Sequence, residues 1–67
     1  MSYEDFQAKV EAALKPAGLD GLTWTEVRMI GELSQMFPNN QWVHRLERDL
    51  GLQRKRDAHG IIHWRLV

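Results

Sequence analysis

The chain has 67 residues, of which 43% are hydrophobic and 27% charged, and it contains no cysteine. This composition is typical of one small globular domain, so we expect residues 1–67 to form a single domain, too small for an enzyme with a deep cleft. The lack of cysteine excludes disulfides, thiolate metal sites and cysteine nucleophiles. Nine basic and nine acidic residues give a formal net charge of zero, which by itself argues against a nucleic-acid partner.

The first 21 residues predict one helix and a connection. From Tyr3 to Leu14 apolar residues recur at spacings of three and four, which is typical of an amphipathic helix. This helix should stop near Lys15, because Pro16 disfavours helical geometry in the residue before it. Residues 16–21 are therefore expected to form a connection.

A capping pattern marks the start of a second helix. In the pattern Thr23-x-x-Glu26 the hydroxyl caps one free amide and the carboxylate reaches back to another, so the helix is expected to begin at Trp24. Its end is left open by Gly31, which either closes the helix early in a left-handed conformation or lies inside it until Ser34 or beyond. The predicted inward positions are Trp24, Val27, Ile30 and Leu33.

A third helix is predicted from about Asn40 to Leu50. It follows Pro38 and Asn39, residue types that favour helix starts, and it precedes Gly51, which is expected to close it in the left-handed conformation. Helical periodicity divides it into an apolar stripe and an opposite polar face. The stripe holds Trp42, Val43, Leu46 and Leu50, and the polar face holds Gln41, His44, Arg45 and Arg48.

After Gly51 the hydrophobic period changes to two. Alternating residues at 52–57 and 62–66, separated by the turn sequence Asp57-Ala58-His59-Gly60, predict a β-hairpin. Gly60 stands where a hairpin loop of this length is expected to need a positive φ.

The residue types on the third helix and the hairpin suit nucleic acid. Asn and Gln side chains can bond bidentately to adenine edges, and Arg can bond to guanine or to phosphate. Arg54, Lys55 and Arg56 are consecutive near the hairpin tip and can flank a phosphate backbone. The alternatives are structural, because every amphipathic helix has a solvated face and charged strands prevent edge-to-edge aggregation.

Taken in order, these elements resemble a winged helix-turn-helix domain over nearly the whole chain. The resemblance rests on Leu22-Thr23-Trp24-Thr25-Glu26-Val27, on Pro38-Asn39-Asn40-Gln41-Trp42-Val43 and on His63-Trp64-Arg65-Leu66. It implies an α+β fold of three helices followed by a C-terminal β-hairpin wing, with a minimal first strand near Leu22.

The resemblance also implies a DNA-binding module in which the third helix enters the major groove of double-stranded DNA and the wing reaches phosphates or the minor groove. Such a module would serve a small transcriptional regulator or a DNA-processing accessory. The expected helix contacts are Asn39, Asn40, Gln41, His44, Arg45 and Arg48, and the expected wing contacts are Arg54, Lys55, Arg56 and His59. Thr23 and Thr25 are expected to add phosphate contacts. The alternative is a winged-helix module that binds protein and not DNA, its partner a second copy in a homodimer or a larger protein.

The zero net charge is the sum of two opposite halves. Residues 1–34 hold three Lys or Arg against six Asp or Glu, a net charge of −3, whereas residues 35–67 hold six against three, a net charge of +3. The positive charge thus lies in the elements expected to touch DNA.

Catalysis and metal binding are not expected. Ser2 and Ser34 lack a plausible His partner, no Gly-rich phosphate loop is present, and His59-x-x-x-His63 has no matching acid or cysteine to complete a zinc site. We therefore expect no enzyme, no cofactor and no metal. Apolar runs do not exceed three residues, whereas a spanning helix needs about 20, so a soluble, cytoplasmic protein without a membrane partner is expected.

Overall fold

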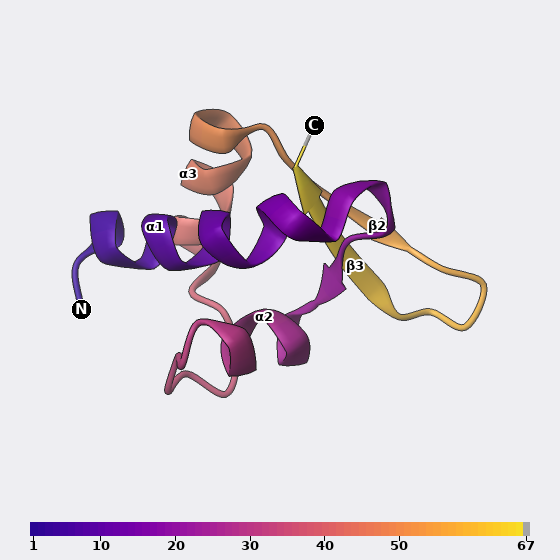
Figure 1. The fold of residues 1–67 in the computed structure, drawn as a ribbon, viewed down its shortest axis with the longest axis horizontal. Coiled ribbons are helices and arrows are strands. Elements are labelled where there is room, and N and C mark those ends of the chain that lie inside the picture. Colours follow the sequence, from indigo (N-terminus) through magenta and orange to yellow (C-terminus); the bar gives the residue numbers. More distant parts are fainter. Residues whose placement is uncertain (67) are drawn as a thin grey trace.

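A computed structural model describes residues 1–66, which form three α-helices, one 3₁₀ segment and a three-stranded antiparallel sheet. In chain order the elements are α1 (Tyr3–Leu14), η1 (Lys15–Asp20), β1 (Leu22–Thr23), α2 (Trp24–Ile30), α3 (Asn40–Leu50), β2 (Leu52–Arg56) and β3 (Ile62–Leu66) (Figure 1). The predicted α+β class, with three helices followed by a C-terminal hairpin, is confirmed. The minimal strand predicted near Leu22 is present as β1.

The start of α1 and the connection after it follow from local signals. The Ser2 hydroxyl accepts a hydrogen bond from the Asp5 amide at 3.1 Å and so caps the helix. The expected connection over residues 16–21 is largely 3₁₀ helical and is broken at Gly18, where φ is +63°. Proline is tolerated in the first turn of such a helix, so Pro16 ends α1 without ending helical geometry.

The capping box predicted for α2 is formed in full. Thr23 Oγ1 accepts from the Glu26 amide at 3.2 Å, and Glu26 Oε1 accepts from the Thr23 amide at 2.9 Å. Both bonds satisfy amides that a helix start leaves free, which is why α2 begins at Trp24 as predicted.

The end of α2 differs from the prediction in two respects. The helix stops at Ile30, but the left-handed residue is Glu32 with φ +53°, and Gly31 keeps helical geometry. The Leu33 amide donates to the Arg28 carbonyl at 2.8 Å, the bond that closes a Schellman motif. Ile30, predicted to point inward, is 60% exposed, because the chain leaves the helix there and Leu33 fills the core position instead.

The third helix has the bounds and the closing glycine that the sequence predicts. Asn39 Oδ1 accepts from the Trp42 amide at 3.1 Å at its start, and Gly51 has φ +70° at its end. Val43 and Leu46 of the predicted apolar stripe are fully buried, and Trp42 and Leu50 pack against the core.

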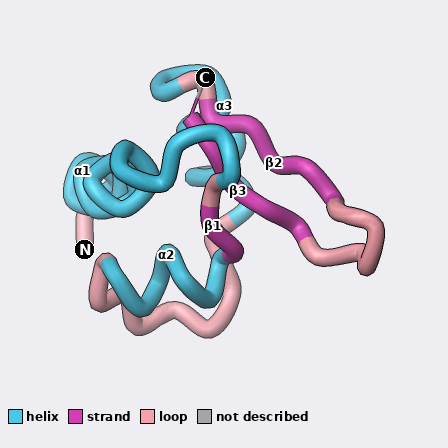
Figure 2. Tube along the Cα trace, turned by 45° about the vertical axis from the view of Figure 1, so that its right-hand side comes forward, coloured by secondary structure: helices cyan, strands magenta, loops and turns pink. Residues whose placement is uncertain are grey.

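The sheet has the strand order β1-β3-β2, so β3 is central. Arg54 lies opposite Trp64 and Arg56 lies opposite Ile62 across the hairpin. Because side chains alternate along a strand, these four share one face, and the burial of Trp64 identifies it as the inner face toward the helices. Figure 2 shows the hairpin extending away from the helices to a free tip.

One aromatic cluster holds the helices on the inner face of the sheet. The ring centroids of Trp24 and Trp64 lie 5.2 Å apart, and those of Phe6 and Trp42 lie 5.2 Å apart. All three tryptophans thus pack in or against the core, as predicted. Among residues 1–66 no helix combines the length and the apolar character needed to cross a membrane.

Candidate nucleic-acid interface

The polar face of α3 is open to solvent. Gln41, His44 and Arg48 are exposed, as are Asn40 and Arg45, while the opposite side of the helix is buried through Val43 and Leu46. The structure therefore brings together on one surface five of the six residues predicted to contact DNA from this helix. The remaining one, Asn39, uses its side-chain oxygen to cap α3, so its acceptor is already occupied.

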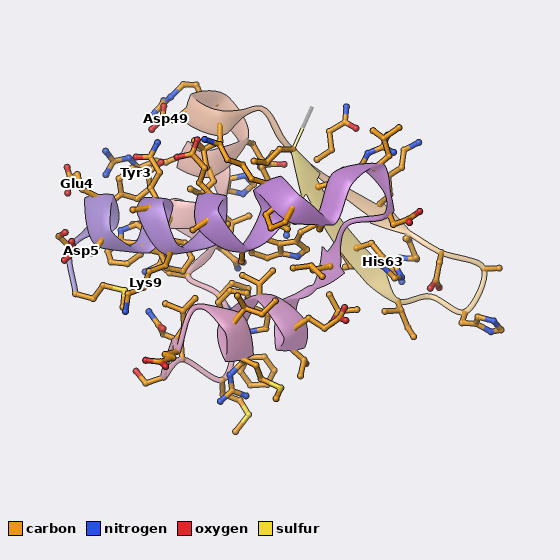
Figure 3. The ribbon with its side chains drawn as sticks, in the orientation of Figure 1. Tyr3, Glu4, Asp5, Lys9, Asp49 and His63 are labelled. Carbon is orange, nitrogen blue, oxygen red and sulfur yellow. The ribbon has the colours of Figure 1, made fainter. Side chains whose placement is uncertain are left out.

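The first turn of α1 borders this face on one side. The guanidinium carbon of Arg45 lies 3.7 Å from the centre of the Tyr3 ring, an arrangement stabilised by cation–π attraction. The Tyr3 hydroxyl donates to Asp49 Oδ2 at 2.8 Å, and Arg48 Nε reaches Asp49 Oδ1 at 3.4 Å. Figure 3 shows Tyr3 and Asp49 directed toward each other from α1 and α3. Tyr3 and Asp49 thus orient both arginines of the face.

The charges at this border are set by the same contacts. The hydrogen bond from Tyr3 lowers the pKa of Asp49, and the nearby Arg48 and Arg45 lower it further. Burial raises the pKa of Tyr3, and the Asp49 hydrogen bond adds to that rise. Glu4 and Asp5 occupy the same end of α1 (Figure 3), so the surface becomes acidic beyond Arg45. These acidic side chains would repel a polyanion, so a polyanion bound to this face would not extend past this border.

The hairpin borders the face on the other side, and Glu47 is the link. Its Oε1 lies 2.8 Å from His44 Nδ1, and its Oε2 lies 3.9 Å from Arg54 Nη2. A carboxylate has no proton to give, so the imidazole N–H donates to it. A hollow of about 250 Å³ lies between the helix and the inner hairpin face, lined by Glu47, Arg54, Arg56 and Ile62.

The three consecutive basic residues of β2 do not share one face. Arg54 and Arg56 lie on the inner face, which continues the polar face of α3, whereas Lys55 lies opposite His63 on the outer face. A second hollow of about 250 Å³ opens on the outer face between η1 and the hairpin, lined by Leu19, Asp20, Lys55, Arg56, Asp57, His63 and Arg65. Arg56, at the end of β2, therefore lines both hollows. The basic side chains of β2 therefore lie on two different surfaces of the molecule.

The hairpin tip is organised by Asp57. Its Oδ1 accepts from the backbone amides of His59 at 2.8 Å and Ile61 at 3.0 Å, and its Oδ2 accepts from His63 Nε2 at 2.8 Å. The hydrogen bond from His63 is the main cause that lowers the pKa of Asp57, followed by the Ile61 amide. Because Asp57 holds the turn through the His59 backbone, the exposed His59 side chain takes no part in it.

Thr23 and Thr25 lie apart from this surface. Thr23 pairs with His63 from β1, which is the edge of the sheet opposite to β2, and its hydroxyl caps α2. Thr25 is exposed in the first turn of α2. No hydrogen bond or ion pair within residues 1–66 connects either threonine to α3, so their phosphate contacts stay a prediction.

Sequence reasoning did not single out Tyr3, Asp49 and Glu47 as parts of the candidate interface. Tyr3 and Asp49 are 46 positions apart, so no local sequence pattern could pair them. The periodicity of the first helix also placed Tyr3 among its apolar, inward positions. The contact between Glu47 and His44 could have been predicted, because side chains three positions apart on a helix are neighbours. Within residues 1–66 no three His, Asp or Glu side chains gather as metal ligands would.

Comparisons of this chain with protein-family models, with curated proteins and with solved structures find no match.

Proposed function

We propose that this chain binds double-stranded DNA as a winged-helix module, with α3 in the major groove and the β2–β3 hairpin as a wing on the flanking backbone. One observation carries the proposal: the polar face of α3 and the arginine-bearing inner face of the hairpin meet at Glu47, which contacts both His44 and Arg54. A single surface thus carries side chains suited to base edges beside side chains suited to phosphates. A small transcriptional regulator or a DNA-processing accessory would use such a module.

The dimensions of α3 suit this role. Its 11 residues span roughly 16 Å at 1.5 Å per residue, and the major groove of B-DNA, about 12 Å wide, admits a helix. Gln41 and His44 lie along the middle of the exposed face, where they would enter deepest and read base edges, and Arg48 beside them would reach a phosphate. Arg45, held at the α1 border by Tyr3, would reach a phosphate.

The wing would act through its inner face. Glu47 holds Arg54 close to α3, which leaves Arg56, nearer the tip and exposed, freer to reach the backbone. Lys55 points to the outer face and would contribute little to a duplex bound at α3. The basic side chains available to one duplex are therefore Arg45, Arg48, Arg54 and Arg56.

Charge predicts weak and salt-sensitive binding by one copy. The whole chain has no net attraction for DNA, so local complementarity must supply the affinity. Four arginine–phosphate contacts give a slope of about −3.6 for the logarithm of the binding constant against the logarithm of salt concentration.

The experiment is a fluorescence-anisotropy titration of a random-sequence duplex over a series of salt concentrations, with Arg48→Ala beside the wild type. The substitution is expected to weaken binding at every salt concentration and to reduce the magnitude of the slope by about one. Lys9→Ala is the matched control, since it removes one exposed positive charge from α1, outside the proposed surface. It should change neither quantity.

Two results would contradict the proposal: no binding by the wild type at the lowest salt concentration, or equal losses for Arg48→Ala and Lys9→Ala. The first result would favour the alternative of a winged-helix module that binds protein and not DNA. The second would mean that only bulk charge attracts the duplex.

A further inference from the structure

An exposed apolar patch lies outside the proposed DNA surface. This apolar patch consists of Met29, Ile30, Met36 and Phe37, whose exposed fractions are 72%, 60%, 65% and 80%. They belong to the end of α2 and to the loop that leads to α3. Trp24 Nε1 donates to the Met36 carbonyl at 2.9 Å, which holds this loop alongside α2 and makes one surface of the two segments. The largest exposed apolar patch of a small domain is often functional, so this surface is a candidate interaction site.

The apolar patch lies away from the hairpin and from the C-terminal end of α3. In Figure 1 and Figure 2 alike, α2 and its loop form the lower edge of the molecule, whereas the end of α3 lies at the upper edge and the hairpin projects to the side. None of its four residues lines the hollow between α3 and the hairpin.

The charges beside the apolar patch fit a second copy of the same chain. Arg28 adjoins Met29, and Glu32 lies between the α2 and loop parts of the patch. Within residues 1–66 neither has an ion-pair partner. Glu32 has left the helix with φ +53°, which removes it from the position where it would face Arg28 in its own copy.

We propose that the apolar patch is the interface of a two-fold symmetric dimer of this chain, with Arg28 of each copy facing Glu32 of the other. A two-fold interface joins the same surface on both copies, so opposite charges beside one patch pair twice across the axis. The zero net charge of the chain means that two copies do not repel each other.

The area of the apolar patch predicts a weak dimer. Four side chains of this size and exposure present on the order of 500 Å². A standard interface buries about 800 Å² per partner, which the patch approaches only with its charged border included. The dimer is therefore expected to dissociate on dilution through the micromolar range.

The test is sedimentation equilibrium without DNA, from low micromolar to near-millimolar protein, so that its outcome is independent of DNA binding. The wild type should shift from monomer toward dimer, and Phe37→Glu should remain monomeric over the whole range. Leu19→Glu is the matched control: Leu19 is an equally exposed apolar residue at 77%, but it lies in η1 outside the patch, so its substitution should leave dimerisation unchanged. Circular dichroism checks that each variant is folded.

A charge exchange tests the two-fold arrangement itself. Arg28→Glu and Glu32→Arg should each weaken the dimer, because each places like charges opposite one another, and the double variant should restore it. A wild type that stays monomeric at every concentration would overturn the proposal and leave a different protein as the occupant of the patch. Dimerisation that survives Phe37→Glu would overturn it as well.

Discussion

Tyr3 connects two helices through both ends of its side chain. Its ring supports the Arg45 guanidinium, and its hydroxyl donates to Asp49 on the same helix, α3. A residue that belongs to the core by its ring thereby fixes the position of a charged side chain on the surface. The contact joins residues 46 positions apart, so it forms only when α1 and α3 have packed together.

The Tyr3–Asp49 hydrogen bond predicts an acid-dependent contribution to stability. Because it lowers the Asp49 pKa in the folded chain, the stabilisation is present above the ordinary pKa of 3.8 and is lost as pH falls through the folded-state value. Tyr3→Phe keeps the ring and removes the hydroxyl. The fall in the urea unfolding midpoint between about pH 5 and about pH 2 should therefore be smaller in Tyr3→Phe than in the wild type.

Asp57→Asn serves as the comparison for that measurement. Its carboxylate also has a lowered pKa, chiefly through the His63 hydrogen bond, so its loss should flatten the same acid profile. A Tyr3→Phe profile identical to that of the wild type, with Asp57→Asn flattened, would contradict the role given to the Tyr3 hydroxyl.

At the scale of elements, the two-residue strand β1 depends on the glycine before it. Gly21 has φ +69° and ψ −167°, a conformation that is essentially restricted to glycine, and its α-carbon faces the Trp64 backbone. This close approach lets β1 pair with β3 and thereby seals one edge of the sheet over the aromatic core.

Gly21 and Gly18 give a matched pair of substitutions. Both have positive φ with extended ψ, but a β-carbon at Gly18 would meet no atom within 4 Å, whereas one at Gly21 would overlap the Trp64 carbonyl oxygen. Gly18→Ala should lose about 1–3 kcal/mol of unfolding free energy from backbone strain alone. Gly21→Ala should lose more, as measured by urea unfolding. Equal losses would mean that the close approach to Trp64 contributes nothing.

The elements that sequence reasoning predicted well are those with local signals. The Thr23–Glu26 box, the Asn39 cap and the left-handed Gly51 each act within one turn of their own helix, so the start of α2 and both ends of α3 could be placed in advance. The closure of α2 could not. Glycine is the usual left-handed residue at a helix end, yet Gly31 keeps a negative φ of −82° and Glu32 takes the left-handed conformation.

At the scale of the whole molecule, the candidate site exists only because α1, α3 and the hairpin pack against one another. The sequence predicted an exposed polar face on α3 and a basic hairpin, and it located the positive charge in residues 35–67. Which hairpin face would adjoin α3 depends on the strand register, which places Arg54 and Arg56 beside the helix and Lys55 away from it. The borders at Tyr3 and Glu47 depend on contacts between elements, for which a single sequence holds no periodic signal.

In the proposed complex, DNA contacts the polar face of α3 together with the inner face of the hairpin. The most direct measurement is amide chemical-shift mapping of isotopically labelled protein during titration with a duplex at low salt. We expect the perturbed amides to fall in residues 40–48 and 54–62, with residues 29–37 unchanged at fixed protein concentration. Perturbations confined to residues 29–37 or to the outer face of the sheet, or no perturbation at all, would contradict it.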